Sequence, residues 1–255
     1  MKIFATCMEC LKELGHPSFD PIIANYYNDS IAFVECDRGH RSALILQSLK
    51  FEILLESAVN ALIDGYTLEA ASALSSAYER FFEFTIKVLC SKQGVNDQEL
   101  KNTFKHVSRQ SERQLGGFLF LYLLEFGESY NIDKKLVKFR NKVIHKGYIP
   151  TPNEVEGFAE KVYSEIYLIT QKLKSQCGGH IQKVIMADLE DRNRKLPSNM
   201  PRATSTGTIF FSLSHEEQKV SFHEAFIYYK YSQKMMLDST PNMKALSNLI
   251  KNSES

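Results

Sequence analysis

The chain has 255 residues, of which 44% are hydrophobic and 24% are charged, and its formal net charge is +1. This length can bury a full hydrophobic core, and the near-neutral charge excludes a general electrostatic attraction to nucleic acid. The longest apolar run, Phe118 to Leu124, is far shorter than the roughly 20 residues that a membrane-spanning helix needs. Because no signal-like apolar segment precedes Cys7, we expect a cytoplasmic protein whose cysteines are reduced.

Four potential metal ligands lie in the first 40 residues. Cys7 and Cys10 form a CxxC pair, and Cys36 and His40 form a CxxxH pair at a spacing typical of tetrahedral zinc sites. Gly39 suits the tight backbone turn of a zinc knuckle. We therefore predict a zinc-ribbon-like segment over residues 1–40, with a structural Zn²⁺ bound by Cys7, Cys10, Cys36 and His40.

The sequence is also compatible with other interpretations of these ligands. His16 is a rival to His40 as the fourth ligand, and the CxxC pair alone is also typical of redox sites. The zinc could instead be catalytic, with three cysteine ligands and an open fourth position, for which Glu9 and Glu13 are the early candidates for a catalytic carboxylate. We favour a structural ion, since four protein ligands leave no position for water.

Helical periodicity of apolar residues begins after the ligand segment. Residues 41–63 predict one long helix, and Thr67 is expected to cap the next one. On the flank of this second helix, Glu79 and Glu83 are interpreted as solvated carboxylates, with Glu83 paired with Lys87 one turn on.

Further helices are predicted between residues 96 and 177. Residues 96–99 resemble a capping box, residues 133–144 form a short amphipathic helix, and Thr151-Pro-Asn-Glu154 opens a long helix. Gly178-Gly179 is expected to end the helical region. Together these elements predict a mainly α protein with a bundle of four or five helices over residues 41–177.

Residues 178–255 are predicted to form a small C-terminal extension of mixed strand and helix. Residues 184–187 and 208–213 are expected to be strands of a short hairpin, and residues 216–236 a helix. Tyr228 and Tyr229 in that helix are interpreted as core-packing residues, although aromatic side chains beside lysines also stack on bases.

The short helix at residues 133–144 begins a basic segment, residues 134–146, that contains no acidic residue. Arg140 is a permanent cation that can hold a phosphate, Asn141 can orient a neighbouring group, and His145 can move a proton near neutral pH. The alternative is an ordinary surface helix, in which cations near the C-terminus offset the helix dipole.

The spacing of Arg140 and His145 is a geometric problem for a joint site. At about 100° per residue, positions five apart on a helix point about 140° away from each other. Either the helix loosens near Gly147, or two copies related by a two-fold axis bring both pairs into one cleft.

Arg140-Asn-Lys-Val-Ile-His145 resembles the Arg-x4-His motif of the HEPN superfamily, whose small four- or five-helix bundles often act as ribonucleases. The helix over residues 70–89, with Tyr78-Glu-Arg-Phe81 at its middle, is similar to an early helix of that family, so the resemblance covers roughly residues 41–175. It implies a homodimer that cleaves RNA without metal, through attack by the neighbouring 2′-hydroxyl at a composite site. Arg140 would bind the scissile phosphate, His145 would be general acid or base, and Asn141 would position them.

The same resemblance implies a toxin or anti-phage defence effector with an antitoxin or defence-system partner protein. In family members paired with a nucleotidyltransferase antitoxin, a tyrosine follows the histidine by two residues, whereas Tyr148 follows by three, so we do not expect it to be adenylylated. We predict that Lys138, Lys142 and Lys146 contact the RNA. The alternative is a non-catalytic module whose zinc ribbon and basic helix bind nucleic acid or a partner protein.

Overall fold

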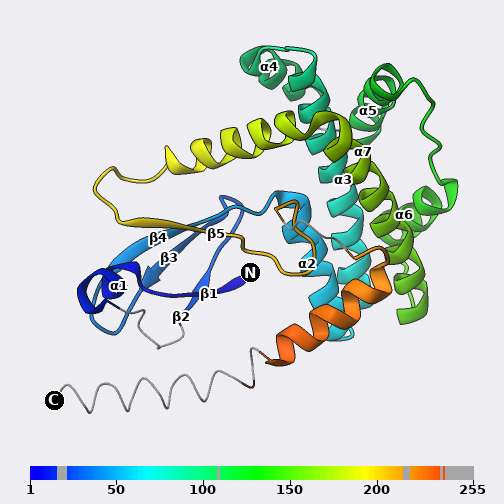
Figure 1. The fold of residues 1–255 in the computed structure, drawn as a ribbon. Helices are drawn as coiled ribbons and strands as arrows, with labels where there is room; N and C mark the ends of the chain where they lie inside the picture. The colour runs from blue at the N-terminus through cyan, green and yellow to red at the C-terminus, as the bar shows by residue number, and fades with distance from the viewer. Residues whose placement is uncertain (16–21, 108–109, 215–218, 236–237, 239–255) are drawn as a thin grey trace. The chain divides into compact units, whose positions relative to one another are not determined.

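The computed structural model describes residues 1–15, 22–107, 110–214, 219–235 and 238. These residues form a mainly helical structure with two small sheets (Figure 1). The chain divides into two compact units. One comprises Met1–Ser48, Ala187–Ile209 and the described part of Ile227–Ser255, and the other comprises Leu49–Met186 and Phe210–Phe226.

The first unit contains both sheets and one short helix. β1 and β2 pair in antiparallel fashion, while β4 lies between β3, which is antiparallel to it, and β5, which is parallel. The bounds of these elements are β1 Lys2–Ala5, α1 Met8–Leu14, β2 Ile22–Asn25, β3 Ile31–Glu35, β4 Arg41–Leu46 and β5 Arg202–Ser205.

A small apolar cluster and one buried arginine stabilise the three-stranded sheet. Ile31, Ile45 and Leu196 are buried together in this cluster. The Arg192 side chain is 8% exposed, and its guanidinium donates to the backbone carbonyl of Ser48 at 3.2 Å. A buried guanidinium is stable only when its N–H groups have hydrogen-bond acceptors. This contact therefore holds the residues that follow β4 against the segment around Arg192, which precedes β5.

The second unit consists mainly of six helices, of which α3 contacts α2, α4, α5 and α6. Their bounds are α2 Lys50–Ile63, α3 Thr67–Lys92, α4 Asp97–Val107, α5 Ser111–Phe126, α6 Lys134–Lys146 and α7 Pro152–Asn193, whose last residues belong to the first unit. Phe51 packs against Phe81 with ring centroids 5.1 Å apart, and Phe82 packs against Phe118 at 4.5 Å. These aromatic contacts join α2, α3 and α5.

Local signals in the sequence predicted the start of α7 correctly and the limits of α6 to within two residues. Asp133 caps α6 by accepting a hydrogen bond from the Lys135 N–H at 2.7 Å, and Gly147 ends the helix with a φ of 63°. Thr151 and Glu154 form the predicted capping box, in which the Glu154 carboxylate accepts the Thr151 N–H at 2.9 Å. The predicted Glu83–Lys87 ion pair is also present, at 2.7 Å.

The prediction of one long helix from residue 41 is wrong at its start, because residues 41–46 form β4 and α2 begins at Lys50. The segment Ser42–Leu46 is a short, almost continuous apolar run, and such a run is compatible with either a buried strand or a buried helix. The first compact unit therefore extends to Ser48, beyond the predicted boundary at residue 40.

The predicted C-terminal hairpin is also wrong. α7 consists of two helical stretches that meet at a kink at Cys177, where the backbone angles are not helical, and the second stretch runs over Gly178-Gly179 and residues 184–187 to Asn193. The predicted end at Gly178-Gly179 therefore corresponds to this kink, one residue earlier, and not to the end of helical structure. Two glycines cost a helix about 1 kcal/mol each relative to alanine, and the burial of Cys177 and Ile181 offsets this cost. The strand that does form is β5, not residues 208–213.

Two buried glutamates of α2 hold residues 210–213. The Phe210 N–H donates to the Glu56 carboxylate at 3.1 Å, and the Leu213 N–H donates to Glu52 at 2.5 Å. Of the helix predicted over residues 216–236, the structure describes a helix at 222–235, while residues 215–218 and 236 lie outside the described part of the chain. Among the described residues, every helix is too short or too polar to cross a lipid bilayer.

Candidate functional site

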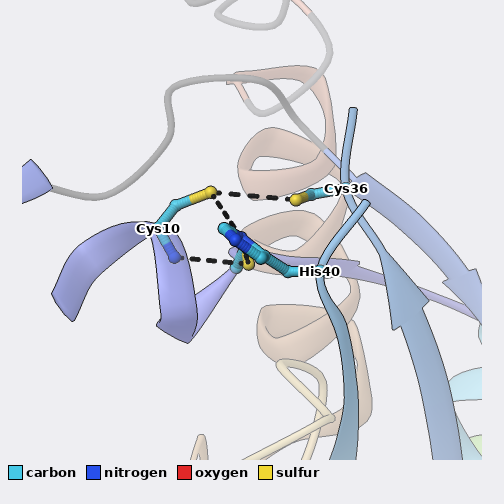
Figure 2. Close-up of side chains that lie close together, drawn as sticks. Cys10, Cys36 and His40 are labelled. Carbon is cyan, nitrogen blue, oxygen red and sulfur yellow. Dashed lines mark hydrogen bonds between the residues drawn. The ribbon is translucent and has the colours of Figure 1, made fainter. Parts of the chain in front are cut away.

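The four predicted metal ligands converge in the first unit (Figure 2). The Cys10 Sγ atom lies 3.7 Å from the Cys36 Sγ and 3.4 Å from the His40 Nδ1, and the Cys7 Sγ lies 3.7 Å from the same Nδ1. All four ligand atoms lie within 4.8 Å of one another. The three cysteines are buried and form no disulfide.

Two pieces of local structure bring these ligands together. Cys7 is the N-cap residue of α1, where its sulfur accepts the Cys10 N–H at 3.5 Å, so both sulfurs lie at the start of one helix. Cys36 and His40 flank the turn between β3 and β4, which Gly39 closes with a φ of 79°. A side chain at residue 39 would be strained at this angle, which explains the glycine in the predicted knuckle.

The surroundings act in opposite directions on two of the thiols. Burial raises the pKa of Cys10 to about 12, and contacts with the Cys7 and Cys36 thiols add to this effect. Burial also opposes ionisation of Cys36, but hydrogen bonds from the backbone of His40 and Arg38 outweigh it and lower the pKa of Cys36. A cation among the sulfurs would favour the thiolate form at all three cysteines.

The distances are compatible with a tetrahedral metal site, as a comparison with zinc bond lengths illustrates. With Zn–S bonds of about 2.3 Å and Zn–N bonds of about 2.0 Å, tetrahedral angles place two sulfurs about 3.8 Å apart and a sulfur about 3.5 Å from a nitrogen. The observed separations of 3.7 Å between Cys10 and Cys36 and 3.4 Å between Cys10 and His40 match these values. The donor set and its geometry are therefore compatible with a bound metal ion.

His40 completes this ligand set, which disfavours the interpretation of three cysteines with an open fourth position. The rival ligand His16 lies outside the described residues, so it is not placed. Glu9, one of the two carboxylates considered for a catalytic zinc, pairs with Lys12 at 2.6 Å on the outer side of α1.

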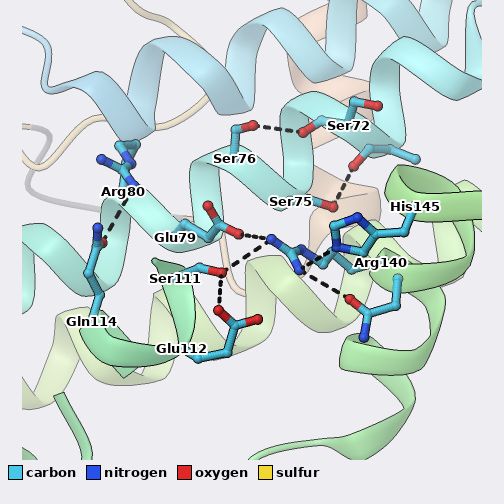
Figure 3. Close-up of polar contacts among 12 residues, drawn as sticks. Ser72, Ser75, Ser76, Glu79, Arg80, Ser111, Glu112, Gln114, Arg140 and His145 are labelled. Carbon is cyan, nitrogen blue, oxygen red and sulfur yellow. Dashed lines mark hydrogen bonds and ion pairs between the residues drawn. The ribbon is translucent and has the colours of Figure 1, made fainter. Parts of the chain in front are cut away.

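The second candidate site surrounds Arg140 in the helical unit (Figure 3). Its Nη1 atom lies 3.1 Å from the Asn141 Oδ1 and 3.4 Å from the His145 Nε2. Its Nη2 atom donates to the Glu79 carboxylate at 2.6 Å and to the Ser111 hydroxyl at 3.3 Å. One guanidinium thus contacts residues from α3, α5 and α6.

Within one chain, the structure brings Arg140 and His145 together without loosening the helix. α6 stays helical through Lys146, and the buried Leu136 and Val143 fix its core-facing side. The long Arg140 side chain reaches round the helix to the imidazole. Because a guanidinium can only donate, the contact requires His145 to accept through Nε2 and therefore, when neutral, to carry its proton on Nδ1.

Glu79 and Ser111 are the site residues that sequence reasoning missed. Glu79 is not the solvated carboxylate that the sequence predicts, because its side chain is only 28% exposed and pairs with Arg140, which is 22% exposed. The two partners lie 61 positions from each other in the chain, so helical periodicity gives no signal for the contact. The only sequence signal was the place of Glu79 in the Tyr78-Glu-Arg-Phe81 segment that resembles the HEPN family.

The three predicted RNA-binding lysines are exposed, but they differ in their contacts. The Lys142 ammonium lies 3.1 Å from the centre of the Tyr148 ring, and the Tyr148 hydroxyl donates to Glu154 at 2.9 Å. The Lys142 ammonium therefore already has a contact within the protein, with the Tyr148 ring. Lys138 and Lys146 lie about one helical turn before and after Lys142 on α6, and both are exposed.

Comparison of the chain with family models, curated proteins and solved structures finds no match. The geometry of the two candidate sites is therefore the basis on which a function can be proposed.

Proposed function

We propose that this protein is a metal-independent endoribonuclease of the HEPN type, with Arg140, Asn141 and His145 as its catalytic residues. The observation that carries the proposal is the 3.4 Å contact between the Arg140 Nη1 and the His145 Nε2, with Asn141 on the same Nη1. This contact supports the proposal because a guanidinium, which can bind a phosphate, lies beside an imidazole, which can transfer a proton.

The two sides of the guanidinium suit different tasks. Nη2 is anchored by a charge-assisted hydrogen bond to Glu79, which is about twice as strong as a bond between neutral groups. Nη1 has longer contacts with the neutral Asn141 amide and with His145. A phosphate oxygen would therefore displace the Nη1 partners first, and it would then lie between Arg140 and the imidazole.

The proposed reaction is an in-line transesterification of the RNA backbone. The 2′-oxygen forms a bond to phosphorus while the bond to the 5′-oxygen of the next nucleotide breaks, which leaves a 2′,3′-cyclic phosphate and a 5′-hydroxyl. A base takes the 2′-hydroxyl proton and an acid gives a proton to the 5′-oxygen. In a homodimer, His145 of each copy would supply one of these groups, and Arg140 would stabilise the charge on the phosphate oxygens.

In this proposal, the Cys7, Cys10, Cys36 and His40 set binds a structural Zn²⁺, because four protein ligands close the coordination sphere. Its role is to hold α1 against the β3–β4 turn, in a segment too short to build a stable core by itself. We also propose a toxin or defence role with an antitoxin or defence-system partner, on the basis of the HEPN resemblance.

The test is cleavage of tRNA and total RNA by the purified full-length protein in excess EDTA. We expect cleavage by the wild type and by a His106→Ala control, which removes an exposed histidine of α4, and none by His145→Ala or Arg140→Ala. Retained cleavage by folded His145→Ala and Arg140→Ala proteins would contradict the catalytic assignment.

The contacts of the Arg140 guanidinium also support a second proposal, a non-catalytic module that binds nucleic acid or a partner protein. Nη1 and Nη2 of Arg140 already contact four side chains of the same protomer. Under this proposal, His145→Ala would leave RNA affinity largely intact, while neutralising Lys138 and Lys146 would flatten the salt dependence of binding, because fewer counterions are released.

A further inference from the structure

The ring nitrogen of His40 that faces away from the cysteines has an acidic partner. Its Nδ1 lies among the sulfurs, as Figure 2 shows, and its Nε2 lies 3.2 Å from the Glu13 Oε1. The other carboxylate oxygen, Oε2, lies 3.1 Å from the Arg38 Nη2. Each Glu13 oxygen therefore has its own partner on the β3–β4 turn.

This arrangement determines which nitrogen can bind a metal. A neutral imidazole carries one proton, and the nitrogen that binds a metal must be the other one. A carboxylate beside Nε2 favours the proton there, since an ionised carboxylate can only accept hydrogen bonds. Nδ1 is then left with its lone pair pointing toward the Cys7 and Cys10 sulfurs.

We propose that Glu13 is an outer-shell carboxylate of the metal centre, which positions His40 to bind through Nδ1 and is itself held by Arg38. This inference rests on the proposed metal binding. Glu13 comes from α1, whereas Arg38 and His40 come from the β3–β4 turn, so the carboxylate also joins the two halves of the ligand set. It follows that Glu13 orients a ligand and is not a general base.

The expected effect is modest because solvent reaches these groups. The Glu13 and Arg38 side chains are 47% and 48% exposed, and His40 is 23% exposed. Loss of an outer-shell partner typically weakens metal affinity by about 10- to 100-fold, and the exposure of Glu13 places the expectation at the lower end, ~10-fold.

The experiment measures Co²⁺ binding to the metal-free full-length protein from the thiolate-to-cobalt absorption, followed by competition with Zn²⁺. We expect Glu13→Ala to bind about 10-fold more weakly than the wild type and Glu13→Gln to be intermediate, because its amide oxygen still accepts the Nε2 proton. Glu9→Gln is the matched control, since Glu9 lies on the same helix but pairs with Lys12. It should bind as the wild type does.

The second readout is the tautomer of His40 in the Zn²⁺-loaded wild type, measured by long-range ¹H–¹⁵N NMR. We expect a proton on Nε2 and none on Nδ1. Equal Co²⁺ affinity of Glu13→Ala and the Glu9→Gln control, or a metal bound through Nε2, would overturn the proposal while leaving the metal site intact. Failure of the wild type to bind Co²⁺ or Zn²⁺ would overturn the metal site and this inference together. If Glu13→Ala does not fold, the comparison of Glu13→Gln with Glu9→Gln decides.

Discussion

The ion pair between Glu79 and Arg140 should make a measurable contribution to stability, and a double-mutant cycle can isolate it. The two side chains are 28% and 22% exposed, and their atoms are 2.6 Å apart. A hydrogen bond between charged groups contributes about 1.5–3 kcal/mol when buried, whereas an exposed ion pair contributes about 0–1 kcal/mol. At this intermediate exposure, we expect a coupling free energy of about 1–2 kcal/mol.

The assay is urea unfolding of the wild type, Glu79→Ala, Arg140→Ala and the double variant. Helical circular dichroism is the suitable signal, because the chain contains no tryptophan. The same cycle on the exposed pair Glu190–Arg194, whose side chains are 63% and 69% exposed, is the control and should give a coupling below about 0.5 kcal/mol. A Glu79–Arg140 coupling free energy within about 0.3 kcal/mol of zero would refute the idea that Glu79 holds the Arg140 guanidinium in place.

Three further predictions concern the metal centre, the buried arginine and the start of α7. Cys36→Ser should abolish stoichiometric zinc binding, because it removes one of the four ligands. The measurement is elemental analysis of the purified protein, and a full zinc content would contradict the ligand assignment. Arg192→Met should lower the free energy of unfolding by about 3 kcal/mol, because the side chain is 8% exposed and its removal leaves buried carbonyls without this donor. The measurement is urea unfolding, and a loss below about 1 kcal/mol would contradict the prediction. Hydrogen bonds from the Thr151 backbone and the Tyr148 hydroxyl lower the pKa of Glu154 from its ordinary value of 4.5. Glu154 therefore adds stability above about pH 4.5 that is lost as the pH falls through its lower folded-state pKa, and Glu154→Gln should reduce the slope of stability against pH in this acid range.

The sequence predicted best the features that depend on neighbouring residues. The capping residues Asp133 and Thr151 mark the starts of α6 and α7 through hydrogen bonds that span only two or three positions. The ligand pairs Cys7–Cys10 and Cys36–His40 are likewise local, and their spacing was enough to predict the convergence that the structure has.

The features that the sequence did not predict depend on tertiary contacts. Residues 41–46 are a strand because they pair with β3 and β5, and β5 lies far along the chain. Helical structure in α7 resumes over Gly178-Gly179 after the kink at Cys177, because buried neighbours offset the low helical propensity of glycine. The ion pair of Glu79 with Arg140 also depends on a tertiary contact, because it forms only where α3 packs against α6. Neighbouring residues in the sequence therefore gave no indication of it.

Cleavage at the Arg140–His145 site can be tested directly from the chemistry of the RNA ends that the protein produces. Wild-type protein and His145→Ala are incubated with tRNA in excess EDTA, and the fragments are analysed for their terminal groups. We expect 2′,3′-cyclic phosphate and 5′-hydroxyl ends with the wild type only, because the proposed attacking group is the neighbouring 2′-hydroxyl. Fragments with 5′-phosphate ends, or equal cleavage by a folded His145→Ala protein, would contradict the proposed Arg140–His145 site.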